Sequence, residues 1–463
     1  MKARKIIALV LSLVMVAAMF AGCGAKEETP AAPSTPSTPS APSAPSAPST
    51  PAEPAKLDIP AVPDLGGMTS LEWLLTREDK LSLGGIAPDH YESRADVYKG
   101  LDQVDPNDDE VVIGWIDISL GAPWFLEVVG SAKARAEEYG YKLLSYDSNF
   151  DLTTQTQQVE NLMAQGIDFL VVDALDIDSM SIYFKQFAEM GIPVIAKGAN
   201  PAKAEYNVVT TVISNCWESG FVNGVYAAEQ TFGKFDEAAK FGTVTTGLDG
   251  FGQSRTCGFI CGYIYKFAEL AGQPYDSKWD ATVVGYNSYI ELRDKGSCKV
   301  GDVINLVGYV TAGNVATSSA APASAELLTA HPDLDIVQVE TDSHGLAMVM
   351  EIQQMGLVPG EDILVCYASD GLNTICEAIE DGIVLSMGSN SPYPCGEDVI
   401  DLIHDIMNGF DANNLPANTY VPTYCINTET LPQVWSGPEQ TYTKMLGEFE
   451  FLNVDEYNAA NAK

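Results

Sequence analysis

Carboxylates are the most abundant groups in this 463-residue sequence that could do acid–base chemistry, with 63 Asp and Glu against 25 Lys and Arg. Because they are so numerous, no pair stands out by its spacing as a general acid and a general base. The motifs of a nucleophile elbow, a phosphate loop and a catalytic zinc (GxSxG, GxxxxGK[ST] and HExxH) do not occur. The stretch GLDGFG (247–252) does not fit the dinucleotide pattern GxGxxG. We therefore predict no catalytic residues and no enzymatic activity.

Nine cysteines and four histidines could hold a metal ion or form disulfides. The cysteines after residue 200 show no CxxC pair and no framework spacing: Cys216, Cys257, Cys261, Cys298, Cys366, Cys376, Cys395 and Cys425. Cys257 and Cys261 would share one helix face, a spacing that suits two metal ligands but also two small core side chains. Since no histidine clusters with them, we predict no metal site and no cofactor. Disulfide pairing stays open.

Aromatic and polar side chains occur together in the segments that follow several apolar runs. Flat aromatic faces suit the C–H surfaces of a polyol, and carboxylate, guanidinium and amide groups bind its neighbouring hydroxyls. Ligands of parallel α/β sheets bind beyond the carboxyl ends of the strands, which is where these segments would lie. The segments are 117–125, 173–178, 197–200, 247–255, 311–315, 340–343, 368–371 and 388–393.

The elements that must position these segments alternate regularly from Val111 onward. Buried-strand runs such as VVIGWI, IDFLVVDA and DILVCYA are separated by stretches with apolar residues at helical spacing, such as 123–139. Strands that alternate with helices of 10–15 residues imply parallel sheets covered on both faces. About 300 residues exceed the usual size of one core, so we predict an α/β fold with two Rossmann-like lobes.

The N-terminus is basic at Lys2, Arg4 and Lys5 and then apolar over residues 6–20, ending in small residues before Cys23. This apolar run is shorter than the roughly 20 residues of a spanning helix, so it predicts an export signal over 1–22. The stretch FAGC resembles a bacterial lipobox, with Phe20 where Leu is usual, and the resemblance implies cleavage before Cys23 and its lipidation. An ordinary signal peptide with an incidental cysteine is the alternative. Residues 23–56, rich in Pro, Ser and Ala, predict an extended linker.

The excess of acidic over basic residues limits the classes of partner that this protein can bind. Without the three leader cations the formal charge changes from −38 to −41, which repels nucleic acid and anionic lipid surfaces.

Residues 57–104 contain one clear signal, a capping box at Thr69 and Glu72 followed by an apolar run, which predicts a short helix. We treat these residues as an extension of unknown role that packs against a lobe.

Residues 111–430 resemble the type I solute-binding proteins of ABC transporters, of the ribose/galactose-binding class. The matching stretches include PWFLEVVGSAKARAEEYGYKLLSYDSNFD, QVENLMAQGIDFLVV, AEMGIPVI, LLTAHPDLDIVQVETD, ASDGLNTICEAIEDG and SPYPCGEDVIDLI, in the family's order. The resemblance implies two lobes joined by a three-strand hinge that close over a ligand. It implies an N-terminal lobe of 105–214 plus 391–419 and a C-terminal lobe of 215–390 plus 420–463.

Carried over residue by residue, the resemblance implies a partial ligand site. Trp124 and Phe125 match the aromatic pair that stacks on a sugar, with core packing as the alternative. Arg255 matches an arginine that holds ligand hydroxyls, with a surface salt bridge as its alternative. Thr341 occupies the position of a family amide. Asp370 and Asn390 match a binding aspartate and a hinge amide, and capping of the helix that follows is the other role open to Asp370.

Several positions depart from the family pattern. An acid–basic pair is replaced by Gly198 and Ala199, and a second-lobe aromatic corresponds to Val315. The longer segment 272–300 is expected to reshape the rim of the site with Trp279, Tyr286 and Tyr289. These changes remove polar contacts and keep the stacking, so they predict a modified or less hydroxylated ligand. Asp342, Asp176 and Asp178 are predicted to cap the helices beside them.

Taken together, these features predict an extracytoplasmic, lipid-anchored solute-binding protein, expected to be a monomer. It would capture a small sugar or sugar-like ligand between its lobes and present it to a membrane ABC permease. A sensory receptor that feeds a chemotaxis or kinase partner is an alternative, and a surface enzyme acting on glycans is another. Gene neighbours separate the first two, and turnover of a bound sugar would identify the third.

Overall fold

The computed structural model describes residues 56–79, 82–86, 94, 97–106, 110–246 and 250–461. Residues 56–463 form one compact unit. The predicted leader, Cys23 and the linker up to residue 55 lie outside the described residues, as do residues 247–249 of the glycine-rich stretch. Within the described part, no helix is both long enough and apolar enough to cross a membrane.

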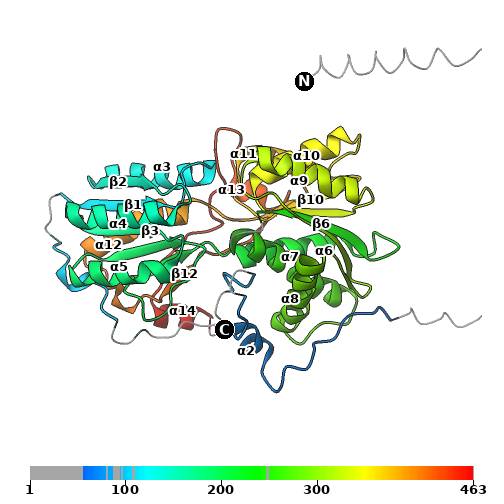
Figure 1. Ribbon diagram of the computed structural model, residues 1–463, viewed down its shortest axis with the longest axis horizontal. Helices are drawn as coiled ribbons and strands as arrows, with labels where there is room; N and C mark the ends of the chain where they lie inside the picture. Colours follow the sequence, from blue (N-terminus) through cyan, green and yellow to red (C-terminus); the bar gives the residue numbers. More distant parts are fainter. Residues whose placement is uncertain are drawn as a thin grey trace, which may run out of the picture. The chain divides into compact units, whose positions relative to one another are not determined.

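The first lobe is built on a six-stranded parallel sheet in the order β12-β5-β4-β3-β1-β2. Its central strands are almost fully buried because helices cover both faces (Figure 1). Its elements are β1 (Val112–Asp117), α3 (Pro123–Glu138), β2 (Lys142–Asp147), α4 (Leu152–Gln165), β3 (Phe169–Asp173), α5 (Ile177–Glu189), β4 (Val194–Gly198), β5 (Thr211–Ile213), η3 (Tyr393–Cys395), α12 (Glu397–Met407), η4 (Ala412–Asn414) and β12 (Asn418–Tyr420).

The second lobe is built on a seven-stranded sheet in the order β13-β11-β10-β9-β6-β8-β7, parallel except at its two edge strands. Its elements are α6 (Cys216–Thr231), β6 (Ala239–Thr245), α7 (Gly250–Leu270), α8 (Lys278–Lys295), β7 (Cys298–Val300), β8 (Ile304–Thr311), α9 (Thr317–Ala330), β9 (Ile336–Val339), α10 (Asp342–Gln354), β10 (Leu364–Tyr367), α11 (Asn373–Glu380), β11 (Ser386–Gly388), β13 (Cys425–Ile426) and α13 (Leu431–Val434). The predicted α/β fold with two mainly parallel sheets is confirmed.

The chain passes between the two sheets after β5, after β11 and between β12 and β13. The passes are hydrogen-bonded to one another: the Val421 amide donates to the Ile213 carbonyl (2.9 Å) and the Ser389 amide to the Tyr424 carbonyl (2.9 Å). These bonds hold the ends of β5 and β11 beside the segment 421–424, so the three passes lie together where both sheets end and form the hinge.

Helices α6 and α7 of the second lobe pack with their backbones in close approach. A Cβ on Gly220 would lie 2.0 Å from the Arg255 carbonyl oxygen, so a larger residue there would separate the helices. The close approach sets the position of the α7 turn that carries Arg255.

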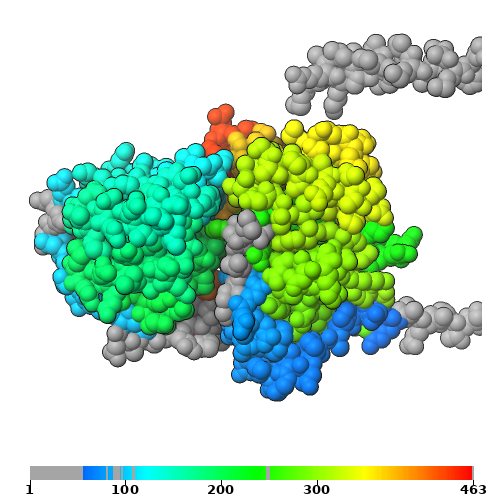
Figure 2. All heavy atoms as spheres, in the orientation of Figure 1, coloured from blue at the N-terminus to red at the C-terminus, as the bar shows by residue number. Residues whose placement is uncertain are grey.

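The extension before the first lobe packs on the second lobe. Its helix α2 (Ser70–Leu75) has the predicted capping box of Thr69 and Glu72, and it packs against α8. Trp73 meets the Tyr286 ring edge-on at 6.1 Å, and Asp79 pairs with Arg293 (2.7 Å). Figure 2 shows these blue residues lying against the green atoms of the second lobe. The remaining elements are η2 (Leu101–Gln103) and, at the other end of the chain, α14 (Val454–Asn461).

The rim expected from segment 272–300 is not formed, and that prediction is wrong. The segment folds as α8 and packs against α7, and Trp279, Tyr286 and Tyr289 all lie in the core of the second lobe. Trp279 stacks on Trp217 with ring centroids 5.9 Å apart. The three aromatic side chains are buried because α7 covers them on one side and the extension covers α8 on the other.

Candidate functional site

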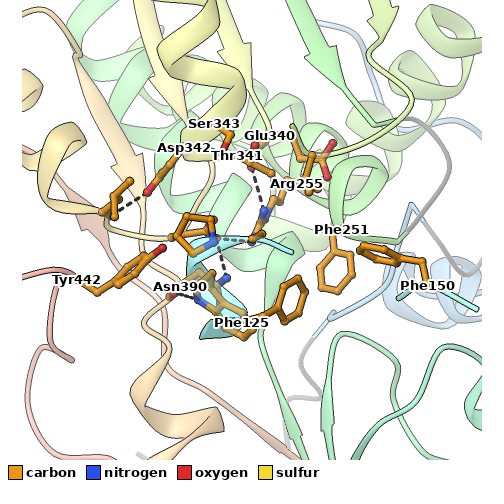
Figure 3. A pocket seen from close by; sticks show the side chains of 16 residues that line it. Phe125, Phe150, Phe251, Arg255, Glu340, Thr341, Asp342, Ser343, Asn390 and Tyr442 are labelled. Atoms are coloured by element: carbon orange, nitrogen blue, oxygen red, sulfur yellow. Dashed lines mark hydrogen bonds and ion pairs between the residues drawn. The ribbon is translucent and has the colours of Figure 1, made fainter. Parts of the chain in front are cut away.

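A pocket lies between the lobes, at the carboxyl ends of strands from both sheets (Figure 3). It contains about 690 Å³ of empty space, counting the part open to solvent. Its wall is formed by Ala122, Pro123, Trp124, Phe125, Phe150, Phe251, Arg255, Val315, Glu340, Thr341, Asp342, Ser343, Asp370, Leu372, Asn390 and Tyr442. All six predicted ligand residues therefore line one pocket.

The first lobe contributes a wholly apolar wall, from the start of α3 and the segment after β2. Pro123 occupies the first turn of α3, where its missing amide hydrogen costs nothing, and the aromatic pair follows directly. The Trp124 indole nitrogen donates to the Asn390 carbonyl oxygen (2.8 Å). The Phe125 ring meets Trp124 edge-on with centroids 5.2 Å apart. The hydrogen bond fixes the indole plane while both rings also pack on the first-lobe core.

The second lobe and the hinge contribute a polar network. The Arg255 guanidinium donates to the Glu340 carbonyl oxygen (2.9 Å) and to the Asp370 carboxylate (3.4 Å). The Asn390 amide donates to the same Asp370 oxygen (3.1 Å). Burial raises the pKa of the Asp370 carboxyl, although Arg255 and Asn390 act in the opposite direction. The network thus presents an orientated carboxylate, guanidinium and amide to the pocket.

The capping role left open for Asp370 is not what the structure shows. Helix α11 begins at Asn373 after Leu372, and the Asp370 carboxylate is bonded to Arg255 and Asn390 instead. Thr341 does line the pocket, but its hydroxyl also caps α10 by accepting the His344 amide (3.2 Å).

The prediction that Asp342 caps α10 is wrong. Asp342 lies in the first turn of that helix, and its carboxyl accepts from the Ser369 hydroxyl and the Leu372 amide, both at 2.8 Å. The cap is one residue earlier because Thr341 has the extended backbone that a cap requires.

For α5, Asp176 is the predicted cap and accepts the Ser179 amide (3.1 Å). Asp178 is not a cap, contrary to the prediction. Its carboxylate binds the Lys203 ammonium (3.0 Å) and the Tyr206 hydroxyl across the surface of the lobe.

Polar side chains at the carboxyl ends of β1, β3 and β4 form a buried cluster in the first lobe. The Lys197 ammonium bonds to the carboxylates of Asp117 and Asp173, the latter at 3.3 Å, and the Trp115 indole donates to Asp117 (2.6 Å). Burial raises the pKa of Asp173 to about 6 against the opposing charge of Lys197. Since these groups satisfy one another, and Gly198 follows Lys197, the first lobe presents no charged side chain to the pocket among its described residues.

Several wall residues were not singled out from the sequence. Phe251, Glu340 and Ser343 fall in the predicted carboxyl-end segments without having been assigned a role, whereas Phe150 and Tyr442 fall outside all of them. Phe150 has a left-handed backbone (φ 56°), uncommon for a bulky residue, and its amide donates to the Ile118 carbonyl (2.7 Å). The stretch SNFD, with Asp151 capping α4, is the one sequence signal that marks this turn.

Outside the pocket, the described residues contain no cluster of three or more metal-binding side chains, and no disulfide joins the described cysteines. Cys257 and Cys261 lie in the second-lobe core, in keeping with the core alternative.

Residues 113–411 match the family model of the periplasmic binding protein domain. The chain belongs to the periplasmic binding protein family. It is therefore a binding protein and not an enzyme. It is similar to the ribose import binding protein RbsB of Bacillus subtilis (23% identity over 306 residues, 65% of this chain and 84% of the relative). RbsB of Escherichia coli is 24% identical over 296 residues, covering 63% of this chain and 83% of the relative.

Solved structures of periplasmic binding proteins share the fold. An ABC transporter solute-binding protein from Actinobacillus succinogenes, with bound D-allose, aligns with a TM-score of 0.55 at 18% identity, covering 70% of this chain and 99% of that one. A galactofuranose-binding protein aligns with a TM-score of 0.54 at 17% identity, covering 70% and 96%.

Proposed function

We propose that this protein is an extracytoplasmic solute-binding lipoprotein of an ABC importer. It captures a small sugar or sugar-like ligand between its lobes and delivers it to a membrane permease. The observation that carries the proposal is the pocket itself, with an aromatic wall from one lobe facing the Arg255–Asp370–Asn390 network of the other lobe and the hinge. Related proteins named for ribose import support the same class of ligand.

The two walls define which face of the ligand is polar. Trp124 and Phe125 offer flat apolar surfaces to C–H groups, while Asp370 and Asn390 offer a carboxylate and an amide to hydroxyls. The charged groups at the carboxyl ends of β1, β3 and β4 are bonded to one another within the buried Lys197 cluster. The proposed ligand is therefore a sugar-like ring with few hydroxyls on the face toward the first lobe.

Binding and transport are linked through closure. A ligand that contacts both walls stabilises the closed arrangement more than an open one, and its differential affinity shifts the population of conformations. No bond in the ligand is made or broken. The permease would bind the closed form, and lipid chains on Cys23 would keep the protein at the membrane.

A thermal-shift screen against sugars, polyols and nucleosides tests the proposal, because a ligand of the folded state raises the melting temperature by mass action. With the ligand found, Trp124→Ala should weaken binding by about 2 kcal/mol or more, roughly thirtyfold, as expected for a central aromatic contact. Asp370→Asn should also weaken binding.

Leu126→Ala is the matched control, since Leu126 lies on the same helix with its side chain exposed to solvent. Its affinity should equal that of the wild type. Unchanged affinity of the Trp124 variant would refute the stacking role, and failure of every compound in the screen to bind would refute the proposed ligand class.

A further inference from the structure

The chain continues for 35 described residues, 427–461, after the last strand β13, beyond the part that matches the family domain. Leu431, Val434 and Trp435 pack in the core of the second lobe. Farther along, Phe449 and Phe451 pack against the core of the first lobe. The segment between them, 436–445, therefore runs from one lobe to the other.

This segment is fixed beside the polar network of the pocket. The Asn373 amide donates to the Thr441 carbonyl and the Thr443 amide to the Gly371 carbonyl, both at 2.8 Å. Gly371 has a left-handed backbone (φ 92°), and a Cβ there would lie 2.1 Å from the Thr443 hydroxyl oxygen. Leu372 and Tyr442 thus form an isolated antiparallel bridge, directly after Asp370 and Gly371, at a point where the backbone demands glycine.

A second set of bonds fixes the same segment near Asn390. The Ser391 hydroxyl donates to the Thr443 carbonyl (3.2 Å), and the Tyr424 hydroxyl donates to the Lys444 carbonyl (2.7 Å). The Gln440 amide donates to the carbonyls of Val434 (2.8 Å) and Tyr442 (2.7 Å). The backbone on both sides of Tyr442 is therefore held to the hinge and to the second lobe.

Held in this way, the Tyr442 side chain forms one end of the pocket. It is 2% exposed and lines the pocket with Asp370, Leu372 and Asn390. In Figure 3 it lies at one end of the row of lining side chains, and Phe150 and Phe251 lie at the other. Burial raises the pKa of the phenol, and the nearby carboxyls of Asp370 and Asp342 raise it further, so the hydroxyl keeps its proton and can donate it.

We propose that Tyr442 is a specificity-determining ligand contact, supplied by the C-terminal segment, which closes one end of the pocket and selects compact, single-ring ligands. This inference rests on the proposed function, since it concerns the same pocket. The ring blocks extension of a ligand beyond Asp370 and Asn390, and the phenol hydroxyl offers a hydrogen bond to a ligand oxygen. A ligand with a second ring attached at that end would meet the Tyr442 side chain.

The experiment is titration calorimetry of the full-length protein with a fixed panel: D-ribose, L-arabinose, D-galactose, D-allose, myo-inositol, maltose, adenosine and uridine. The variants are Tyr442→Ala, which removes the ring, and Tyr442→Phe, which removes the hydroxyl alone. Tyr183→Phe is the matched control, because the Tyr183 hydroxyl of α5 also donates a hydrogen bond, to Glu160 (3.1 Å), but Tyr183 does not line the pocket.

We expect Tyr442→Ala to weaken binding of the best single-ring ligand at least about tenfold, the loss typical of a buried aromatic contact. The affinity for maltose relative to that ligand should rise. Tyr442→Phe should weaken binding of that ligand severalfold, and Tyr183→Phe should keep the wild-type affinities and their order. If Tyr442→Ala does not fold, as judged by circular dichroism, Tyr442→Phe decides by its loss of affinity.

Equal affinities and the same order of ligands in the wild type and the Tyr442 variants would overturn the inference and leave the proposed function intact. A wild type that binds a nucleoside and no sugar would overturn the proposed ligand class. The role of Tyr442 would then be tested by comparing the affinities of the wild type and the Tyr442 variants for that nucleoside. A wild type that binds no compound of the panel would overturn both.

Discussion

Asp342 and Asp370 place two carboxyl groups beside Arg255 in the pocket wall. Burial, and then the charge of Asp370, raises the pKa of Asp342 to about 7. Arg255 bonds directly to Asp370, whereas Asp342 is bonded to a hydroxyl and a backbone amide. One member of this pair therefore holds a proton at a pH where an ordinary aspartate has lost it.

The consequence for stability follows from proton linkage. Between about pH 4 and pH 7 the folded state keeps a proton on Asp342 that the unfolded state has lost, so the free energy of unfolding falls as pH rises through this range. Asp342→Asn removes that titration. We expect the melting temperature of the ligand-free variant to fall less between pH 5 and pH 7.5 than that of the wild type, measured by calorimetry.

The exposed Asp381, on the same lobe, supplies the control: Asp381→Asn should reproduce the wild-type pH dependence. Parallel curves for the wild type and the Asp342 variant would show that Asp342 does not titrate in this range. Asp173 and Asp398, whose pKa values burial raises to about 6 and about 7, contribute in the same direction and are unchanged in both variants.

Helix α2 of the N-terminal extension packs against α8 and so forms part of the second lobe. The Ser277 hydroxyl caps α8, whose aromatic residues face α7 on one side and α2 on the other. Arg293 near the end of α8 pairs with Asp79 of the extension. The extension between residues 56 and 86 therefore covers apolar surface that α8 would otherwise expose.

Leu74→Ala tests this role of α2. Leu74 is 1% exposed and lies in the second-lobe core, so its truncation should cost about 2–5 kcal/mol of unfolding free energy, measured by urea denaturation. The neighbouring Leu75 is 61% exposed, and Leu75→Ala should change the same quantity by about 0.5 kcal/mol or less. Similar effects of the two variants would mean that α2 does not contribute to the stability of the folded lobe.

For the molecule as a whole, connections beyond the hinge link the lobes. The extension also reaches the first lobe, where the Lys99 ammonium donates to the carbonyls of Ala412, Asn413 and Leu415 at 2.9–3.0 Å. At the other end, residues 420–463, assigned to the second lobe on resemblance, include Phe449 and Phe451, which pack on the first-lobe core. Both ends of the described chain thus contact both lobes, and movements of the lobes must accommodate them.

The proposed anchor is tested on whole cells. Cys23→Ala should release the protein from the membrane fraction, because the lipid chains would be lost, while its affinity for the ligand should stay that of the wild type. Fractionation followed by immunoblotting measures the distribution. Cys425→Ala, at a cysteine of β13 inside the folded lobe, is the control that should stay with the membrane; retention of the Cys23 variant there would contradict lipidation at Cys23.

The order of elements could be read from the sequence because buried strands and amphipathic helices have different periods. The alternation from Val111 onward, the capping box at Thr69 and the cap at Asp176 all depend on residues close together in the chain. The convergence of Arg255, Asp370 and Asn390 followed from a family resemblance together with the rule that the carboxyl ends of parallel strands meet.

Tertiary packing decided the rest. The length of segment 272–300 led to the prediction that Trp279, Tyr286 and Tyr289 form the rim of the site. These side chains are buried instead, because α2 and α7 enclose α8. Tyr442 had no local signal, since it enters the pocket only through pairing of the segment 441–443 with 371–373, far away in sequence. Composition and periodicity thus determine which strands and helices form, whereas the walls of the pocket depend on long-range contacts that one sequence does not encode in any short pattern.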